Sequence, residues 1–111
     1  MPTLFTRIIQ GEIPSNRVWE DELCVAFRDI HPTAPVHVLV VPRKELTRLD
    51  QMTAEDEPLI GHLMHVAVKV AKQEGLTDFR TVINTGAGAG QSVFHLHVHV
   101  IGGRSLSWPP G

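Results

Sequence analysis

The sequence has one cysteine, no long apolar run and no excess of either charge. The lone Cys24 excludes an internal disulfide and favours a reducing compartment. Its neighbours in "LCVAFRD" predict a small buried hydrophobic residue and not a reactive thiol. No stretch reaches the length of a membrane span, and "MPTLFTRIIQGEIP" at the N-terminus lacks the pattern of a signal peptide. We therefore expect a cytoplasmic protein with no membrane partner.

The charge balance limits the partners further. Ten basic and 12 acidic residues give a net charge of -2, so the chain lacks the basic surface that nucleic acid requires. The 111 residues are 42% hydrophobic and 20% charged, which is typical of a globular chain with one core. We predict a single domain over residues 1–111 and no nucleic-acid partner.

The hydrophobic pattern predicts an α+β fold, in which one antiparallel sheet packs with one short and one long helix. The short helix lies within residues 3–14, with an apolar side formed by Leu4, Phe5, Ile8 and Ile9, and stops at Gly11 and Pro14. The predicted strands are 17–21, 23–30, 36–42, 79–86 and a fifth within 92–103.

The long helix is expected between Thr53 and Glu74, with Thr53 as a possible cap, Pro58 leaving the start open and Gly75 as the stop. Its apolar stripe includes Leu59, Leu63, Val66 and Val70, which exceeds what one small sheet face needs. We therefore expect a contact between the long helices of two copies of the chain.

Several polar features have simple interpretations. His62 and His65 are three apart on one helix face with Lys69 and Lys72; a metal pair is conceivable, but a solvated polar face is favoured. His31 precedes a proline and is expected at the surface.

The glycines of "GAGAGQS" indicate a turn in which Gly86, Gly88 and Gly90 supply positive φ. They match neither a Walker phosphate loop nor a dinucleotide fingerprint.

Histidines occupy every second position of "HLHVH", at His95, His97 and His99. On a strand they share one face, while Leu96, Val98 and Val100 face a core. Three interpretations stay open. The rings are solvated, or they bind a metal together with His37 from another strand, or one of them is a nucleophile.

Nucleophilic catalysis at phosphorus fits the neighbouring residues. A neutral imidazole attacks phosphorus without a strong base and forms a labile phospho-imidazole. Backbone N–H groups of the glycine-rich turn can bind phosphate oxygens, and Ser92 can donate to a leaving atom. All of these groups lie between Gly86 and His99.

The segment "HLHVHVI" resembles the signature of the histidine triad (HIT) family. The blocks "IIQGEIP", "AFRDIHPTAPVHVLVVPRK", "INTGAGAGQSVFHLHVHVIGGR" and "WPPG" resemble its nucleotide-binding branch, often called Hint, over nearly the whole chain. The resemblance implies a HIT-like homodimer in which two five-stranded sheets join into one ten-stranded sheet. It also implies hydrolysis of purine nucleoside phosphoramidates, such as adenosine 5'-phosphoramidates and aminoacyl- or lysyl-adenylates, through a covalent nucleotidyl-histidine. No metal and no cofactor is implied.

The resemblance assigns catalytic roles by position. His97 would be the nucleophile and His99 would polarise the α-phosphate. His95 and His37 would orient these rings, and Ser92 would contact the phosphate or the leaving nitrogen.

The same resemblance assigns nucleotide-binding residues. Gln91 and Val93 would lend backbone near the phosphate, Asn84 would hold the ribose-phosphate end, and Asp29 would accept hydrogen bonds from the ribose hydroxyls. The base would lie against Phe5, Ile8, Phe27 and Ile30, although core packing explains Phe27 equally well. Trp108 would lie near the site of the partner subunit.

One position departs from the family pattern. Some relatives carry a further histidine where this chain has Glu45, which puts a proton relay through that position in doubt. Two other functions remain alternatives: a purine nucleotide-binding interaction module with vestigial catalysis, and a dinucleoside polyphosphate hydrolase. The "WPPG" ending favours the phosphoramidase-like branch, while the leaving group and the choice between adenine and guanine stay open.

Overall fold

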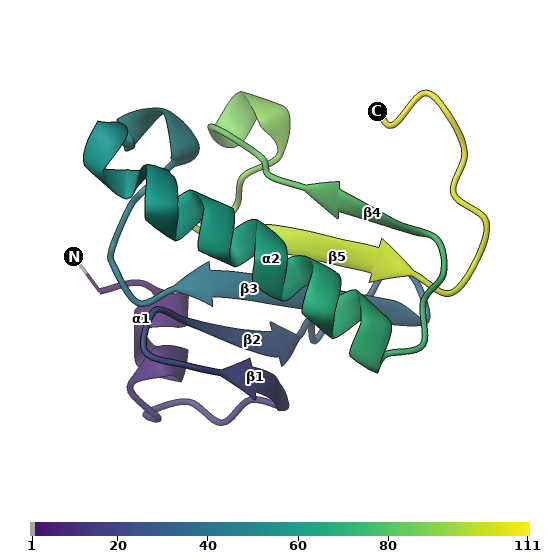
Figure 1. Ribbon diagram of the computed structural model, residues 1–111. Coiled ribbons are helices and arrows are strands. Elements are labelled where there is room, and N and C mark those ends of the chain that lie inside the picture. The colour runs from purple at the N-terminus through teal and green to yellow at the C-terminus, as the bar shows by residue number, and fades with distance from the viewer. Residues whose placement is uncertain (1) are drawn as a thin grey trace.

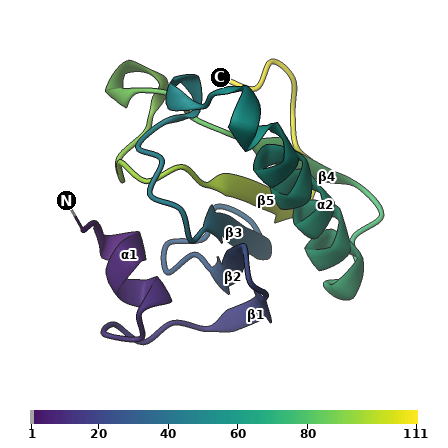
Figure 2. The same ribbon diagram turned by 60° about the vertical axis from the view of Figure 1, so that its left-hand side comes forward.

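A five-stranded sheet lies between two helices in the computed structural model, which describes residues 2–111 (Figures 1 and 2). The helices are α1 (Leu4–Ile9) and α2 (Glu57–Gln73). The strands are β1 (Arg17–Glu20), β2 (Cys24–Arg28), β3 (Val36–Pro42), β4 (Phe79–Val82) and β5 (Val98–Gly102). They follow the order β1-β2-β3-β5-β4, and every neighbouring pair is antiparallel. The predicted α+β fold is confirmed.

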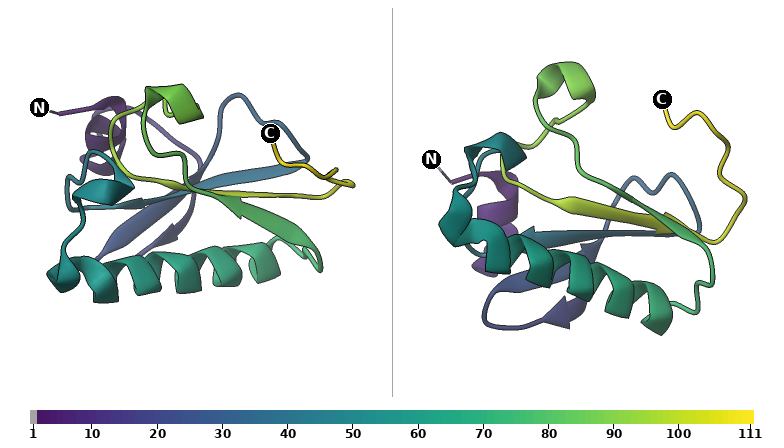
Figure 3. Two further views of the ribbon diagram at one scale, coloured as in Figure 1. Left: turned by 90° about the horizontal axis from the view of Figure 1, so that it is seen from above. Right: turned by 45° about the horizontal axis from the view of Figure 1, so that its top comes forward.

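The two faces of the sheet carry separate apolar clusters, because successive side chains of a strand point to opposite faces. The larger cluster lies under α2 and joins Leu63, Val66 and Val70 to strand residues such as Val38 and Val98. The smaller cluster lies under α1 and contains Phe5, Ile8, Val25, Phe27, Leu39 and Val41. Figure 3 shows the sheet from above, with α2 along one face and α1 on the other.

The strand register brings two of the predicted histidines together on the α1 face. Leu39 of β3 lies opposite His99 of β5, and His37 lies opposite Ile101. Residues opposite each other share a face, so His37 and His99 are diagonal neighbours on the side of Leu39. Phe27 also pairs with Leu39, which extends this row of side chains across β2.

The fifth strand is shorter than predicted. β5 begins at Val98, so of the three triad histidines only His99 lies within it, and the chain bends at residues 93–95. The N–H of Leu96 donates to the carbonyl of Leu46 at 2.7 Å, outside the sheet. The expected inward direction of the intervening residues is correct, since Leu96, Val98 and Val100 are all buried in the cluster under α2.

Other boundaries also shift. The helix α2 starts at Glu57, because a 3₁₀ turn at Ala54–Asp56 precedes it, and Thr53 forms a capping box with Asp56 on that turn. The strands β2 and β4 end earlier than expected, at Arg28 and Val82. In the glycine-rich turn, Gly86 and Gly90 have positive φ but Gly88 does not, because it lies inside a 3₁₀ turn at Ala87–Ala89.

The apolar stripe of α2 does not support the dimer argument made from the sequence. Leu63, Val66 and Val70 are 1%, 1% and 0% exposed, and Leu59 packs against the same cluster. The chain's own sheet therefore covers the residues that had seemed in surplus. Among residues 2–111, no helix is both long and apolar enough to cross a membrane.

Candidate active site

A cavity of about 280 Å³ opens on the α1 face of the sheet. It lies between α1, the end of β2 and the segment that leads into β5. Many predicted site residues line it: Phe5, Ile8, Phe27, Asp29, Ile30, Ser92, Val93, His97 and His99. The sequence did not point to several others, among them Leu4, Ile13, Pro14, Ser15 and Leu39. The cavity thus brings an apolar wall together with His97 and His99.

The apolar wall is built from α1 and β2. Phe5 and Phe27 pack edge to face with ring centroids 5.5 Å apart, and both are nearly buried. The ring of Phe5 also lies edge-on to His97, with centroids 4.9 Å apart. Ile30 also lines the cavity, at its edge, and is 82% exposed.

His97 is held in one orientation by its neighbour's backbone. Its Nδ1 lies 2.7 Å from the carbonyl oxygen of His95, and a carbonyl only accepts, so Nδ1 carries the proton. The neutral ring therefore has its lone pair on Nε2. Burial lowers the pKa of His97 and outweighs the hydrogen bond to the carbonyl.

A chain of hydrogen bonds places the proton of His99 on Nε2, the ring nitrogen that is unprotonated in His97. The N–H of Thr33 donates to Nδ1 of His37 at 3.1 Å, so neutral His37 carries its proton on Nε2. That Nε2 lies 2.9 Å from Nδ1 of His99, which must accept. The proton of His99 is consequently on Nε2, which is buried and has no partner among the described residues.

Burial also lowers the pKa of His99, to about 4, and the neighbouring rings of His97 and His37 add to the effect. Burial lowers the pKa of His37 as well, although Asp29 opposes it. These rings are therefore neutral at pH 7. The cavity presents an acceptor nitrogen on His97 and a donor N–H on His99, with the ring centroids 4.9 Å apart.

Asp29 lies at the end of β2 beside this histidine pair. Its Oδ1 accepts the N–H of His31 at 2.8 Å, and its Oδ2 lies 3.4 Å from Nε2 of His37. The backbone N–H of Asp29 donates to the carbonyl of His37, which ties the loop to β3. The carboxylate is half-buried and lines the cavity, so it retains capacity to accept further hydrogen bonds.

His95 does not line the cavity with its ring. The ring is 1% exposed, and its Nε2 donates to the carbonyl of Pro42 at 2.8 Å. Its Nδ1 lies 3.5 Å from the Thr6 hydroxyl, which donates to Glu45 at 3.1 Å. Burial lowers the pKa of His95. His95 thus orients His97 through its carbonyl oxygen, and Glu45, at the position that departs from the family pattern, is connected to His95 through Thr6.

Besides His37 and His95, three predicted residues lie outside the cavity. The Gln91 side chain is buried, where it accepts the N–H of Gly86 and donates to the carbonyls of Thr47 and Val93, so it holds the glycine-rich turn in place. Asn84 is half-buried and does not line the cavity. Trp108 is 82% exposed and contributes nothing to the cavity of its own chain.

Thr33 contacts His37 but was not predicted as a site residue from the sequence. Its role depends on a backbone N–H, which every residue except proline carries. Only the fold of the 29–36 loop brings that N–H to His37, so no residue type at position 33 marks it.

A metal held by four imidazoles does not fit this arrangement. The ring of His95 is occupied by Pro42 and the threonines, and His97 uses Nδ1 on a backbone carbonyl. A different group does converge, because Asp29, His37 and His99 place ligand atoms within 4.8 Å of one another.

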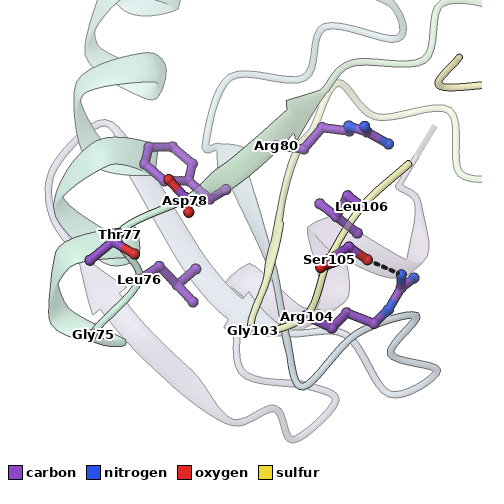
Figure 4. Close-up of a pocket in the computed structure, with 10 residues that line it drawn as sticks. Gly75, Leu76, Thr77, Asp78, Arg80, Gly103, Arg104, Ser105 and Leu106 are labelled. Carbon is purple, nitrogen blue, oxygen red and sulfur yellow. Dashed lines mark hydrogen bonds between the residues drawn. The ribbon is translucent and has the colours of Figure 1, made fainter. Parts of the chain in front are cut away.

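A larger cavity of about 620 Å³ lies elsewhere, between the α2–β4 turn and the segment that follows β5 (Figure 4). Asp78 lies on one side of it with Leu76 and Thr77, and Arg80 lies on the side of Ser105 and Arg104. It contains none of the predicted site residues, and the histidines lie in the smaller cavity.

Comparison with known proteins agrees with the fold and identifies the family. The model of the HIT domain family matches residues 10–106. The chain is 56% identical to an uncharacterised HIT-like protein of Synechococcus elongatus, over 98% of this chain and 96% of that one. It is 51% identical to a protein of Zea mays named 14 kDa zinc-binding protein, over 99% of this chain and 88% of the relative.

Solved structures of HIT family proteins have the same fold as this chain. A HIT family hydrolase from Legionella pneumophila superposes with a TM-score of 0.95 at 44% identity, covering 97% of this chain and 98% of that one. A histidine triad protein from Clostridium difficile superposes with a TM-score of 0.92 at 40% identity, covering 96% and 95%. The fold is that of the HIT family hydrolases. The chain belongs to the HIT domain family.

Proposed function

We propose that the protein hydrolyses purine nucleoside phosphoramidates through a covalent nucleotidyl intermediate on His97. The observation that carries this proposal is the pair of fixed tautomers in the cavity. His97 offers an unprotonated Nε2, and beside it His99 offers a buried, unpartnered N–H. A nucleophile next to a donor for a developing oxyanion is what attack at phosphorus requires.

The remainder of the cavity suits a nucleotide. The base packs against the apolar wall of Phe5, Ile8 and Phe27, and Ile30 covers it from the exposed edge. Asp29 accepts hydrogen bonds from the ribose hydroxyls. The α-phosphate then lies between His97, His99 and the Ser92–Val93 backbone.

The reaction has two displacements at phosphorus. In the first, the lone pair on His97 Nε2 forms a bond to the α-phosphorus while the bond from phosphorus to the amine nitrogen breaks. The amine leaves with a proton, which Ser92 helps to transfer from water at the open side of the cavity. In the second, water attacks phosphorus, the bond to His97 breaks and a nucleoside monophosphate is released.

The direct test is turnover of an adenosine phosphoramidate that carries a fluorescent amine, with the wild type and with His97→Ala. Loss of the nucleophile is expected to lower the rate on the order of 10³-fold or more. His65→Ala is the matched control, because this exposed histidine lies on α2 and should leave turnover unchanged. Denaturation during turnover should trap a nucleotidyl adduct, which mass spectrometry assigns to His97.

Two outcomes contradict the proposal. If neither protein turns over substrate but both bind adenosine monophosphate, the protein is a nucleotide-binding module. If diadenosine polyphosphates are cleaved much faster than phosphoramidates, the dinucleoside polyphosphate alternative replaces it.

A metal centre is the second candidate, on the observation that Asp29, His37 and His99 converge. The maize relative's name refers to zinc binding. A metal there would displace the hydrogen bond between the two imidazoles. Dialysis against a chelator distinguishes the two, since the phosphoramidase proposal expects full activity afterwards.

We also propose that the single HIT domain spans residues 1–111 and acts as a homodimer. The strand β4 ends the sheet and pairs only with β5 among the described residues. An open edge of this kind is a site for strand pairing between two copies. The exposed Trp108 would then be available to the site of the partner subunit.

A further inference from the structure

A second group of metal-ligating side chains lies on the opposite face of the sheet from the His97 cavity. Asp21 comes from the turn between β1 and β2, Cys24 begins β2, and His62 projects from α2. Cys24 belongs to the apolar cluster under α2, whereas the cavity is built on the α1 face. Their ligand atoms all lie within 4.8 Å of one another. The sequence favoured a solvated His62; the ring is partly exposed and also contacts Asp21, a partner that the helix pattern did not indicate.

The separations within this group are close to those of a metal site. Oδ2 of Asp21 lies 3.7 Å from Sγ of Cys24 and 2.8 Å from Nε2 of His62. In a tetrahedral zinc site, a sulfur and an oxygen ligand stand about 3.6 Å apart, and an oxygen and a nitrogen ligand about 3.3 Å. The sulfur and oxygen already have this spacing, so only the imidazole must withdraw by about half an ångström.

The surroundings hold the carboxylate in place. Oδ1 of Asp21 accepts the backbone N–H groups of Leu23 and Cys24, and Oδ2 accepts the indole N–H of Trp19 at 2.8 Å. Outer hydrogen bonds of this kind orient the carboxylates of metal sites. By contrast, the thiol of Cys24 has only the long contact to Oδ2, so hydrogen bonding alone does not account for a sulfur in this position.

An ion can reach the group from solvent. The side chains of His62 and Asp21 are 31% and 26% exposed, while Cys24 forms the closed end. The nearby guanidinium of Arg43 donates to the Asp21 carbonyl and is paired with Glu20 at 3.1 Å, so its charge is balanced.

We propose that Asp21, Cys24 and His62 bind one zinc ion, or another thiolate-accepting divalent cation, through Oδ2, Sγ and Nε2. The three ligands join the β1–β2 turn to α2, with water at the fourth position. Binding releases the thiol proton of Cys24, and the single proton of the neutral His62 ring moves from Nε2, where it is donated to Asp21, to Nδ1. The site lies on the far side of the sheet from His97 and has no part in the proposed hydrolysis.

The test uses the full chain, reduced and stripped of metal, and titrates it with cobalt and then zinc. Cobalt bound to thiolate gives a near-ultraviolet charge-transfer band, and zinc should displace it at one equivalent. The band should vanish in Cys24→Ser and in His62→Gln, which keeps a neutral side chain that can still donate to Asp21. His65→Gln, three residues further along α2, is the matched control and should retain the band.

Two results overturn the proposal. The first is a wild-type protein that gives no thiolate band and binds no zinc at the concentrations that saturate other three-ligand sites. The second is zinc binding that survives His62→Gln but is lost in His99→Gln, which would place the ion at Asp29, His37 and His99. The first result does not bear on turnover by His97. The second would place the ion in the His97 cavity, and turnover after dialysis against a chelator then tests the proposed function separately.

Discussion

At the scale of single residues, backbone groups decide which nitrogen of each histidine is reactive. The His95 carbonyl accepts a hydrogen bond from His97 and so keeps the proton of that ring on Nδ1. The Thr33 N–H donates to His37, which in turn donates to His99, so the proton of His99 is on Nε2. Both controlling atoms belong to the main chain, which moves less than a side chain does. The proposed nucleophile and the proposed donor therefore have their protons in place before substrate binds, which is how preorganised electrostatic sites lower a barrier.

The pH dependence of turnover follows from the same residues. The reactive form of His97 is neutral, and burial lowers its pKa below the ordinary 6.5. Protonation on acidification is therefore delayed, so kcat/KM should stay level from about pH 8 to 7 and fall at lower pH, with its midpoint below 6.5. The measurement is a pH series, corrected for spontaneous hydrolysis of the substrate. A decline that begins above pH 7, or full activity near pH 4, would show that His97 is not the titrating nucleophile.

At the scale of elements, the segment between the glycine-rich turn and β5 fixes the position of His97. It is anchored by Gln91 at one end and by Leu96, whose N–H donates to Leu46 and whose side chain is 2% exposed in the main core. His97 lies directly between Leu96 and Val98, which is also fully buried. The catalytic ring thus depends on core packing on the far face of the sheet.

Truncation of Leu96 tests this dependence. Leu96→Ala should lower the free energy of unfolding by about 2–5 kcal/mol, the usual range for a buried leucine. It should also lower turnover in the fraction that remains folded, because the preceding and following residues can shift. Urea unfolding and kinetics at low temperature measure both effects. Val68→Ala, at an exposed position of α2, is the control. An equal loss of stability in this variant would contradict the prediction that burial of Leu96 is what stabilises the segment.

The sequence predicted the kind and order of these elements better than their ends. Alternation of apolar residues correctly placed Leu96, Val98 and Val100 in the core, since burial depends on side-chain direction. The same pattern predicted a fifth strand that is too long, because the hydrogen bond from Leu96 to Leu46 leaves no trace in the apolar alternation.

The surroundings of single residues were harder to predict, because they depend on contacts between segments that are far apart in the sequence. The pairing of His62 with Asp21 joins positions 41 residues apart, and spacing on the helix alone favoured solvent. Likewise, the Thr33 N–H carries no residue-type signal. The triad and the apolar wall were found from the sequence because their residue types are distinctive; the groups that orient them were not.

At the scale of the whole molecule, the two edges of the sheet differ in their capacity to pair with another chain. At one edge, β1 has an irregular register between Arg17 and Trp19, and the Arg17 side chain donates to the carbonyls of Ile8 and Ile9. Irregular edges of this kind resist pairing. At the other edge, β4 pairs in regular register with β5, and its first residue, Phe79, is 37% exposed. A ten-stranded sheet would therefore form through β4.

Sedimentation tests this arrangement. The wild type should have about twice the 12.3 kDa chain mass, and Phe79→Lys should shift it towards the monomer, because a lysine at an edge strand opposes pairing. Leu23→Lys is the matched control, since Leu23 is exposed in the turn between β1 and β2, at the opposite edge. A wild type that is monomeric at micromolar concentration contradicts the dimer. A dimer that survives Phe79→Lys but dissociates with Leu23→Lys would place the contact at β1, and the exposed Trp108 would then need another role.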